Sequence, residues 1–415
     1  MSALINVVFH GEAVGTMRYS EARGKSACSF TYADSWREKG FPLLPSMPLS
    51  QDSYFSSASK ANESAFLPIV SDSMPDSWGR KVIRKTFSDG TPSSLDFLTS
   101  VPDLLRQGAL QYQVDGVLKG DTVIENMQFT IGDLASAARA IERNSEGAFD
   151  RALMRFYGSA SGGARPKASI IDGDDLYIAK FTGLNEAKQT EAAEVMTLKL
   201  ARLCGLNVPD ARCMHVNKFG DIALIKRFDR DQGRRVHYAS GYSFLGVTES
   251  DEFSYVDMAD AMMAHCIQPN LNAQELFRRV AFTCLVSNTD DHLRNHGFLY
   301  DGGWQLSPAF DINPDADRGD TVHLKTPICP DGDYTASIEK LVDFADFFMV
   351  NDPKEIVGHM AQVINENWRT LAQQCGIREV AKYRPAFEHR DAMFAHKLNQ
   401  TCVALRKPTK NDFDL

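Results

Sequence analysis

The chain has 415 residues, of which 43% are hydrophobic and 24% charged, and its net charge at pH 7 is −9. These values are ordinary for a soluble globular protein, and the length suffices for two or three domains. We find no run of roughly 20 apolar residues and no basic leader before an apolar block, so neither a membrane helix nor a secretory signal is expected. The acidic balance argues against a nucleic-acid footprint over the whole chain. The eight cysteines form no C-x-x-C pair, which favours reduced thiols in a cytoplasm over zinc or disulfide frameworks.

The N-terminal part alternates as antiparallel strands do. Residues 4–32 predict a meander with a Gly turn. Residues 71–80 then lead into a basic amphipathic helix that runs to Lys85, and apolar residues at helical spacing predict a helix over 130–143. The basic helix could bind DNA, but the overall charge favours a solvated face.

The pattern changes near residue 167. We expect a hairpin over 168–180, a helix over 190–204, strands at 211–216 and 222–228, and then helices at 254–267, 273–287, 352–374 and 387–406. A mixed part followed by a helical part is the way kinases are built. The predicted domains are 1–145, 146–235 and 236–415.

The most informative motif lies in the helical part. Asp290 is followed five positions later by Asn295, and Asp311 comes 21 positions after Asp290, behind an apolar segment. Protein kinases use a catalytic Asp, a metal-binding Asn and a second metal-binding Asp in this order. Loops favour Asn and Asp in any case, so the D-x-x-x-x-N spacing alone would be weak. His292 has no second His at helical spacing, and we interpret it as structural.

Candidate phosphate-binding residues lie in the mixed part. The small-residue loop 158–167 contains Gly162, Gly163 and Lys167, which could approach a phosphate, although such loops are often only linkers. Lys180 ends an apolar strand, where a kinase has its phosphate-binding lysine. Glu191 or Glu194 on the next helix could pair with it, and we prefer Glu194. Taken singly, each of these residues also fits an exposed surface role.

The segment 223–230 runs from an apolar strand into a charged loop, as a hinge between lobes should. Backbone groups of Lys226 and Phe228 could bond an adenine edge, and Asp229 could meet the ribose. An edge strand with charged ends is the alternative.

Taken together, these motifs resemble the HipA-like serine/threonine kinases, the toxins of bacterial toxin–antitoxin pairs. The resemblance covers nearly the whole chain. It is carried by residues 14–15, 72–80, 108–112, 162–167, 180, 227–230, 288–295 and 310–311.

The resemblance implies an α+β, kinase-like two-lobe fold: a mixed β-rich N-terminal lobe with an added β-meander subdomain, and an all-helical C-terminal lobe. It implies ATP and Mg²⁺, with Asp290 as catalytic base, Asn295 and Asp311 at the metal and Lys180 at the phosphates. Phe310 would pack on the adenine. The implied partner is a small helix-turn-helix antitoxin (HipB-like) through which DNA is bound, and the implied targets are aminoacyl-tRNA synthetases.

One position departs from the family pattern. Ala160 stands where the glycine loop commonly carries an autophosphorylated serine, with Ser159 and Ser161 on either side. A neighbour could take over that role, self-phosphorylation could be lost, or the alanine could have been introduced to silence a toxic chain. Two other functions stay open at this point: a kinase-fold co-repressor that binds an antitoxin with weak catalysis, and a small-molecule phosphotransferase.

Overall fold

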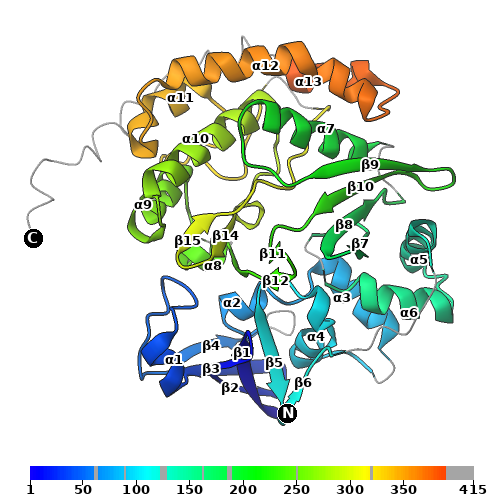
Figure 1. Ribbon diagram of the computed structural model, residues 1–415, viewed down its shortest axis with the longest axis vertical. Coiled ribbons are helices and arrows are strands. Elements are labelled where there is room, and N and C mark those ends of the chain that lie inside the picture. The colour runs from blue at the N-terminus through cyan, green and yellow to red at the C-terminus, as the bar shows by residue number, and fades with distance from the viewer. Residues whose placement is uncertain are drawn as a thin grey trace, which may run out of the picture. The chain divides into compact units, whose positions relative to one another are not determined.

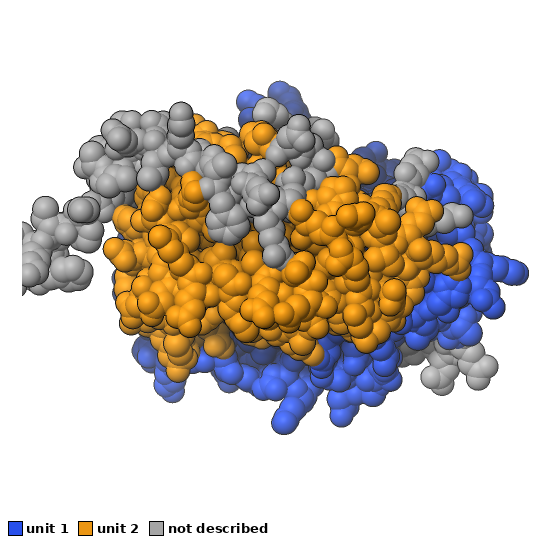
Figure 2. All heavy atoms as spheres, turned by 90° about the horizontal axis from the view of Figure 1, so that it is seen from above, with its two compact units in different colours: residues 1–195, 209–247, 297–302 blue, residues 196–208, 248–296, 303–415 orange. Residues whose placement is uncertain are grey.

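The computed structural model describes residues 1–59, 64–87, 90–121, 129–160, 163–184, 189–248, 251–317 and 321–388. These residues form two compact units, shown in different colours in Figure 2. Unit 1 comprises residues 1–195, 209–247 and 297–302, and unit 2 comprises 196–208, 248–296 and 303–415. The sequence-based division into 1–145, 146–235 and 236–415 stays a prediction.

Unit 1 opens with an antiparallel sheet, drawn in blue and cyan in Figure 1. Its six strands have the order β4-β3-β2-β1-β5-β6. The predicted meander over 4–32 is confirmed, because its three strands are consecutive neighbours and alternate between buried and exposed side chains. The strand bounds are β1 Ser2–Phe9, β2 Glu12–Ala22, β3 Lys25–Tyr32, β4 Tyr54–Ala58, β5 Leu110–Val114 and β6 Val117–Leu118.

Helices of unit 1 supply the core beside the glycine loop. The predicted basic helix is α3 (Ser77–Thr86), which begins at the capping residue Asp76 and buries Trp78 and Val82. The predicted helix over 130–143 is α5 (Ile131–Arg143), which starts with a Thr130–Asp133 capping box. The other helices here are α1 Asp34–Lys39, α2 Pro68–Ser71, α4 Ser94–Ser100 and α6 Ala148–Tyr157, with a 3₁₀ turn at Asp103–Leu105.

A second antiparallel sheet of unit 1 has the order β7-β8-β10-β9. The predicted hairpin is β7 (Lys167–Asp172) with β8 (Asp175–Phe181), and the predicted strands are β9 (Ala211–Val216) and β10 (Gly220–Lys226). The predicted helix over 190–204 is α7 (Thr190–Leu203). Short elements complete the unit: β11 Arg230–Asp231, β12 Arg234–Arg235, β13 His237–Ser240, α8 Gly241–Leu245 and β14 Gly297–Tyr300, which pairs with β13.

Unit 2 is mostly helical. The predictions over 254–267, 273–287 and 352–374 correspond to α9 (Tyr255–His265), α10 (Pro269–Leu285) and α12 (Pro353–Gln374). The predicted helix over 387–406 lies almost wholly outside the described residues. Not predicted were α11 Ile338–Asp343, α13 Arg384–Phe387, β15 Trp304–Leu306 and the 3₁₀ turns Leu293–Asn295, Ala345–Phe348 and Val380–Tyr383. The strands β13, β14 and β15 also show that residues 236–415 are not all helical.

Within the part of the chain that the structure describes, none of the helices combines the length and the apolar character needed to cross a membrane.

Candidate functional site

A buried ion pair joins Lys180, which is predicted to bind phosphates, to Glu194, which is predicted to pair with it. The Nζ of Lys180, at the end of β8, lies 2.6 Å from Oε1 of Glu194 on α7. Glu194 is only 1% exposed, and Val195 and Met196 beside it are fully buried. Each charge in such surroundings needs its partner, because a single buried charge would be strongly destabilising.

The alternative partner, Glu191, makes a different contact. Its Oε2 accepts a hydrogen bond of 2.6 Å from Oγ1 of Thr182. Glu191 is also buried, one turn of α7 before Glu194. The structure therefore favours Glu194 over Glu191 as the partner of Lys180, as the sequence analysis preferred.

The glycine loop rests on the first turn of α3. Lys167 is 3% exposed, and its Nζ lies 3.5 Å from Oδ2 of Asp76. Gly163 has a φ of +104°, and a Cβ at this position would collide with Nζ of Lys167, so only glycine fits there. Burial raises the pKa of the Asp76 carboxyl to about 6, although Lys167 opposes that shift. In this conformation the Lys167 ammonium therefore lies close to Gly163 beside Asp76.

Of the two serines that flank Ala160, the structure describes Ser159. Ser159 is fully buried, and its Oγ donates to the carbonyl of Arg155 at 2.9 Å. Ala160 is buried in the apolar cluster around α5 and α6. Ser161 and Gly162 lie outside the described residues. Phosphorylation of Ser159 would thus require this residue to leave its observed position.

The residues of the predicted hinge make contacts within unit 1. The backbone amide of Lys226 donates to the carbonyl of Asp210 at 2.8 Å, so this amide is not available to an adenine edge. The Lys226 ammonium pairs with Asp175 at 2.7 Å. Phe228 is partly buried against a cluster that includes Tyr238.

Asp229 is engaged within the protein, and its contact with a ribose stays a prediction. Its carboxylate is 2.6 Å from Nη2 of Arg227 and 2.9 Å from Nη1 of Arg230, and it accepts a hydrogen bond of 2.8 Å from the amide of Gly108. Burial alone would raise the pKa of Asp229, but the two guanidinium groups hold it well below its usual value. A carboxylate with these three partners acts as a structural anchor.

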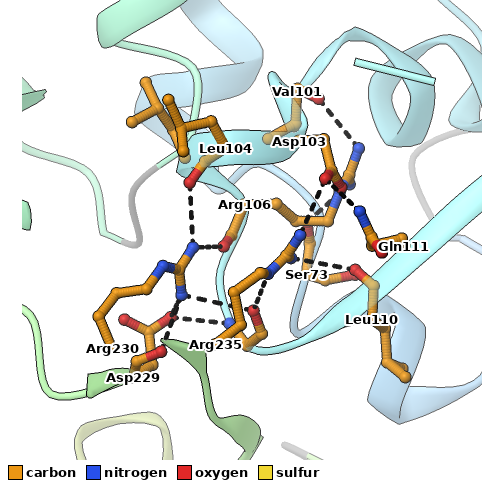
Figure 3. A network of polar contacts seen from close by, with 12 residues as sticks. Ser73, Val101, Asp103, Leu104, Arg106, Leu110, Gln111, Asp229, Arg230 and Arg235 are labelled. Carbon is orange, nitrogen blue, oxygen red and sulfur yellow. Dashed lines mark hydrogen bonds and ion pairs between the residues drawn. The ribbon is translucent and has the colours of Figure 1, made fainter. Parts of the chain in front are cut away.

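This anchor belongs to a wider polar network inside unit 1 (Figure 3). Arg106 is fully buried and donates to the carbonyls of Leu98 and Val101, both at 2.9 Å. Arg235 lies 3.0 Å from Oδ2 of Asp103. The network joins the segment before β5 to the segment that follows β10, and no local sequence pattern signals this pairing.

The predicted catalytic loop follows α10 in unit 2. The carboxylate-bearing residue Asp290 is exposed, and its carbonyl accepts a hydrogen bond of 2.9 Å from Nδ2 of Asn295. The amide of His292 donates to the same carbonyl at 3.0 Å. Among the described residues, Nδ1 of His292 is buried without a hydrogen-bond partner. The loop thus holds Asp290 at the surface and Asn295 beside it.

A second loop of unit 2 carries Asp311 to the same region. Asp311 has a φ of +58°, a left-handed conformation that is uncommon for a residue with a side chain. Its Oδ1 accepts a hydrogen bond of 3.1 Å from the side-chain Nδ2 of Asn313. The backbone amide of Asn313 lies 3.4 Å from Oδ1 of Asn288. The amide of Asp315 also donates to the carbonyl of Ser287. These bonds tie the Asp311 loop to the Asp290 loop.

Next to the predicted catalytic loop lies a buried polar cluster that was not predicted from the sequence. Asp291 is buried and accepts hydrogen bonds from Tyr255 and Thr283, the latter at 3.2 Å, while Nε2 of His296 lies 3.1 Å away. Burial alone would raise the pKa of Asp291, but His296 and these hydrogen bonds hold it below the usual value. Asp291 therefore remains charged and fixes the loop next to Asp290. A run of two Asp residues was the only available signal in the sequence.

The residues of unit 2 fit a hard cation. Asn295 uses its amide nitrogen on Asp290, so its side-chain oxygen is the atom that it can offer, and Asp311 offers a carboxylate. Mg²⁺ prefers such oxygen donors and takes its other ligands from phosphates and water. Among the described residues no group of three or more His, Cys, Asp or Glu side chains gathers at metal-binding geometry. Phe310 is half-buried beside Asp311 in the chain.

Two family models match this chain. The HipA-like C-terminal domain matches residues 159–368, and the HipA N-terminal domain matches residues 5–113. A solved complex of Shewanella oneidensis HipA, HipB and operator DNA contains a chain with a TM-score of 0.64, 16% identity, and coverage of 94% of this chain and 97% of that one. This likeness shows the same fold.

Two curated relatives add to these matches. The serine/threonine-protein kinase toxin HipA of Shewanella oneidensis is 20% identical over 316 residues, which cover 68% of each chain. A Haemophilus influenzae protein provisionally named as a kinase is 25% identical over 135 residues, 29% of this chain and 39% of that protein. The chain thus spans about two fifths of one relative and two thirds of the other. With both family domains present in order, and one of them matching half of the sequence, the chain belongs to the HipA-like kinase family.

Proposed function

We propose that this chain is an ATP- and Mg²⁺-dependent serine/threonine protein kinase that inhibits growth as a toxin. Its target is proposed to be a translation-related protein such as an aminoacyl-tRNA synthetase. The observation that carries the proposal is the buried Lys180–Glu194 pair at 2.6 Å, which holds an ammonium at the end of β8 as phosphoryl transfer requires. A module that only binds a partner has no need of this pair together with Asp290, Asn295 and Asp311.

Each residue has a stated role in the proposed reaction. Lys180 binds nucleotide phosphates, and Glu194 keeps its ammonium in place. Asp290 orients the attacking hydroxyl and accepts its proton, which its exposed position after α10 allows. When bound, Mg²⁺ neutralises charge on the phosphates.

Asn295 and Asp311 would hold that cation with side-chain oxygens. The amide of Asn295 is already fixed by the carbonyl of Asp290 at 2.9 Å, so the loop sets the position of a metal ligand and of the base together. The backbone of the glycine loop at Gly163 and the ring of Phe310 are proposed to contact the nucleotide.

The proposed partner is a small HipB-like helix-turn-helix antitoxin, since a chain of a HipA–HipB–DNA complex has the same fold. DNA would be bound through that partner. The basic residues Arg80, Lys81, Arg84 and Lys85 of α3 are proposed not to bind DNA; Arg84 is exposed, and the other three are partly buried. Salt-dependent DNA binding by the isolated chain, weakened by charge reversal in α3, would contradict this part of the proposal.

The test is transfer of labelled γ-phosphate to a proteome lysate and, in parallel, to a panel of small molecules. Asp290→Asn should lower protein phosphorylation by about 10²–10⁴-fold, because that is the usual contribution of a general base. Asp317→Asn, an exposed carboxylate further along in unit 2, is the matched control and should retain activity. Near wild-type turnover by Asp290→Asn would exclude Asp290 as the base, and label on small molecules alone would exclude a protein kinase.

A further inference from the structure

The first turn of α3 contacts both ends of the glycine loop. The carbonyl of Gly163 faces the amide of Trp78 at 3.4 Å and Oγ of Ser77 at 3.5 Å. Nε1 of Trp78 donates to the carbonyl of Lys167 at 2.9 Å, and Trp78 is 2% exposed. The loop is therefore held by a helix that lies more than 70 residues earlier in the chain.

Packing at the start of the loop is equally close. A Cβ at Gly79 would lie only 2.6 Å from the carbonyl oxygen of Ser159, nearer than real Cβ atoms approach. Glycine at position 79 thus allows α3 to lie directly against the loop. Because α3 touches Ser159, Gly163 and Lys167, its position constrains the loop along most of its described length.

The charged contact at this junction uses both oxygens of Asp76. Oδ1 accepts a hydrogen bond of 2.7 Å from the amide of Gly79 and so caps α3, while Oδ2 faces Nζ of Lys167 at 3.5 Å. The side chains of Lys167 and Asp76 are only 4% and 15% exposed. The ammonium lies close to Gly163, because a Cβ at this position would be 2.4 Å from Nζ.

We propose that Asp76 is a positioning residue for the nucleotide-binding loop, and that it acts by holding the Lys167 side chain close to Gly163. Removing its charge would leave a buried ammonium without this carboxylate, and that ammonium would then move or draw in water. Because the ammonium lies close to Gly163, the loop backbone would move with it. Asp76 belongs to the part of the chain that matches the HipA N-terminal domain, and Lys167 to the part that matches the C-terminal domain. The N-terminal domain would therefore set the shape of a phosphate-binding element in the other domain.

The test measures the loop directly, without nucleotide, by hydrogen exchange of the backbone amides of residues 158–160 and 163–165. Asp76→Asn keeps an oxygen for the Gly79 amide but removes the charge that faces Lys167. Exchange of these amides should become about tenfold faster, which corresponds to a loss of about 1.4 kcal/mol in local stability. Asp76→Glu restores the charge and should recover part of the protection.

A control variant separates this effect from general destabilisation. Asp133 caps α5 in the same unit by accepting a hydrogen bond of 2.7 Å from the amide of Thr130. Asp133→Asn should leave exchange of the glycine loop unchanged, and amides of α5 should keep their protection in Asp76→Asn. Loop exchange in Asp76→Asn equal to that of the wild type, or acceleration spread evenly over α5 and the loop, would overturn the proposal.

The consequence for nucleotide binding rests on the proposed function. If ATP protects the wild-type loop, the KM for ATP should rise about tenfold in Asp76→Asn while kcat changes less, because a distorted loop weakens binding and leaves the base in place. An unchanged KM with faster loop exchange would overturn the link to the nucleotide. Absence of ATP protection in the wild type would overturn the proposed function, whereas the exchange comparison without nucleotide would still decide the role of Asp76.

Discussion

Replacing Asp229 with Asn should destabilise unit 1 strongly, because the carboxylate neutralises two buried guanidinium groups. Asp229 is 3% exposed, and Arg227 and Arg230 lie 2.6 and 2.9 Å from it. Removing one partner of a buried ion pair typically costs about 3–5 kcal/mol. The neutral amide keeps the shape of the side chain and could still accept the hydrogen bond from Gly108, so we expect a value near the lower end, about 3 kcal/mol.

Urea denaturation with fluorescence detection measures this loss. For a slope of about 3 kcal/mol per M, a loss of about 3 kcal/mol lowers the midpoint by about 1 M. The matched control is Asp231→Asn, two residues later. The Asp231 carboxylate is 3.6 Å from Arg234, and both side chains are about half exposed, so its removal should cost at most about 0.5 kcal/mol.

The comparison also tests the two roles of Asp229 against each other. If Asp229→Asn lost no more stability than Asp231→Asn, the structural interpretation would be refuted. A drop in ATP affinity without that loss of stability would support the ribose contact that the sequence suggested.

Three further outcomes are expected. Glu194→Gln should lower kcat/KM by about 10²-fold, measured in steady-state kinase assays, because the Lys180 ammonium loses a buried partner at 2.6 Å; activity equal to wild type would contradict the pair. Asp311→Ala should weaken Mg²⁺-dependent ATP binding more than Asn295→Ala does, because a charged oxygen binds a hard cation better than an amide oxygen. Calorimetric titrations with and without Mg²⁺ measure this difference, and equal losses would contradict the assignment. Burial lowers the pKa of His237 to about 4, below the value of about 6.5 in the unfolded chain. As the pH drops, the unfolded chain therefore binds a proton at this histidine before the folded chain does. The free energy of unfolding should fall by up to about 3 kcal/mol between pH 6.5 and pH 4. The same pH series on His237→Gln should show a smaller loss, and an equal loss would assign the effect to other groups.

Local patterns in the sequence determined most of the elements and the identity of the family. Alternation over 4–32 and helical spacing over 130–143 both correspond to observed elements, because periodicity reports directly which face of an element is buried. The preference for Glu194 also followed from its apolar neighbours. Short elements such as β13 and β14 were missed, since four residues give too few repeats to define a period.

The family motifs identified the candidate site residues but not the residues that contact them. Asp290, Asn295 and Asp311 are fixed by spacing within one short stretch, and the hydrogen bonds from Asn313 to Asn288 and from Asp315 to Ser287, which join their two loops, are consistent with that order. The Asp291 cluster could not be inferred in the same way, because Tyr255 comes from a helix 36 residues earlier in the chain.

Tertiary structure alone decided what the buried charges do. In the sequence, Asp229 follows a strand and Lys167 follows a glycine loop, and both positions are open to a ligand. In the structure, Asp229 pairs with Arg227 and Arg230 and also accepts from Gly108, 121 residues away, while Lys167 faces Asp76, 91 residues away. A buried charge takes the nearest partner that compensates its lost hydration, and for contacts this distant in sequence only the folded chain determines which residue that is.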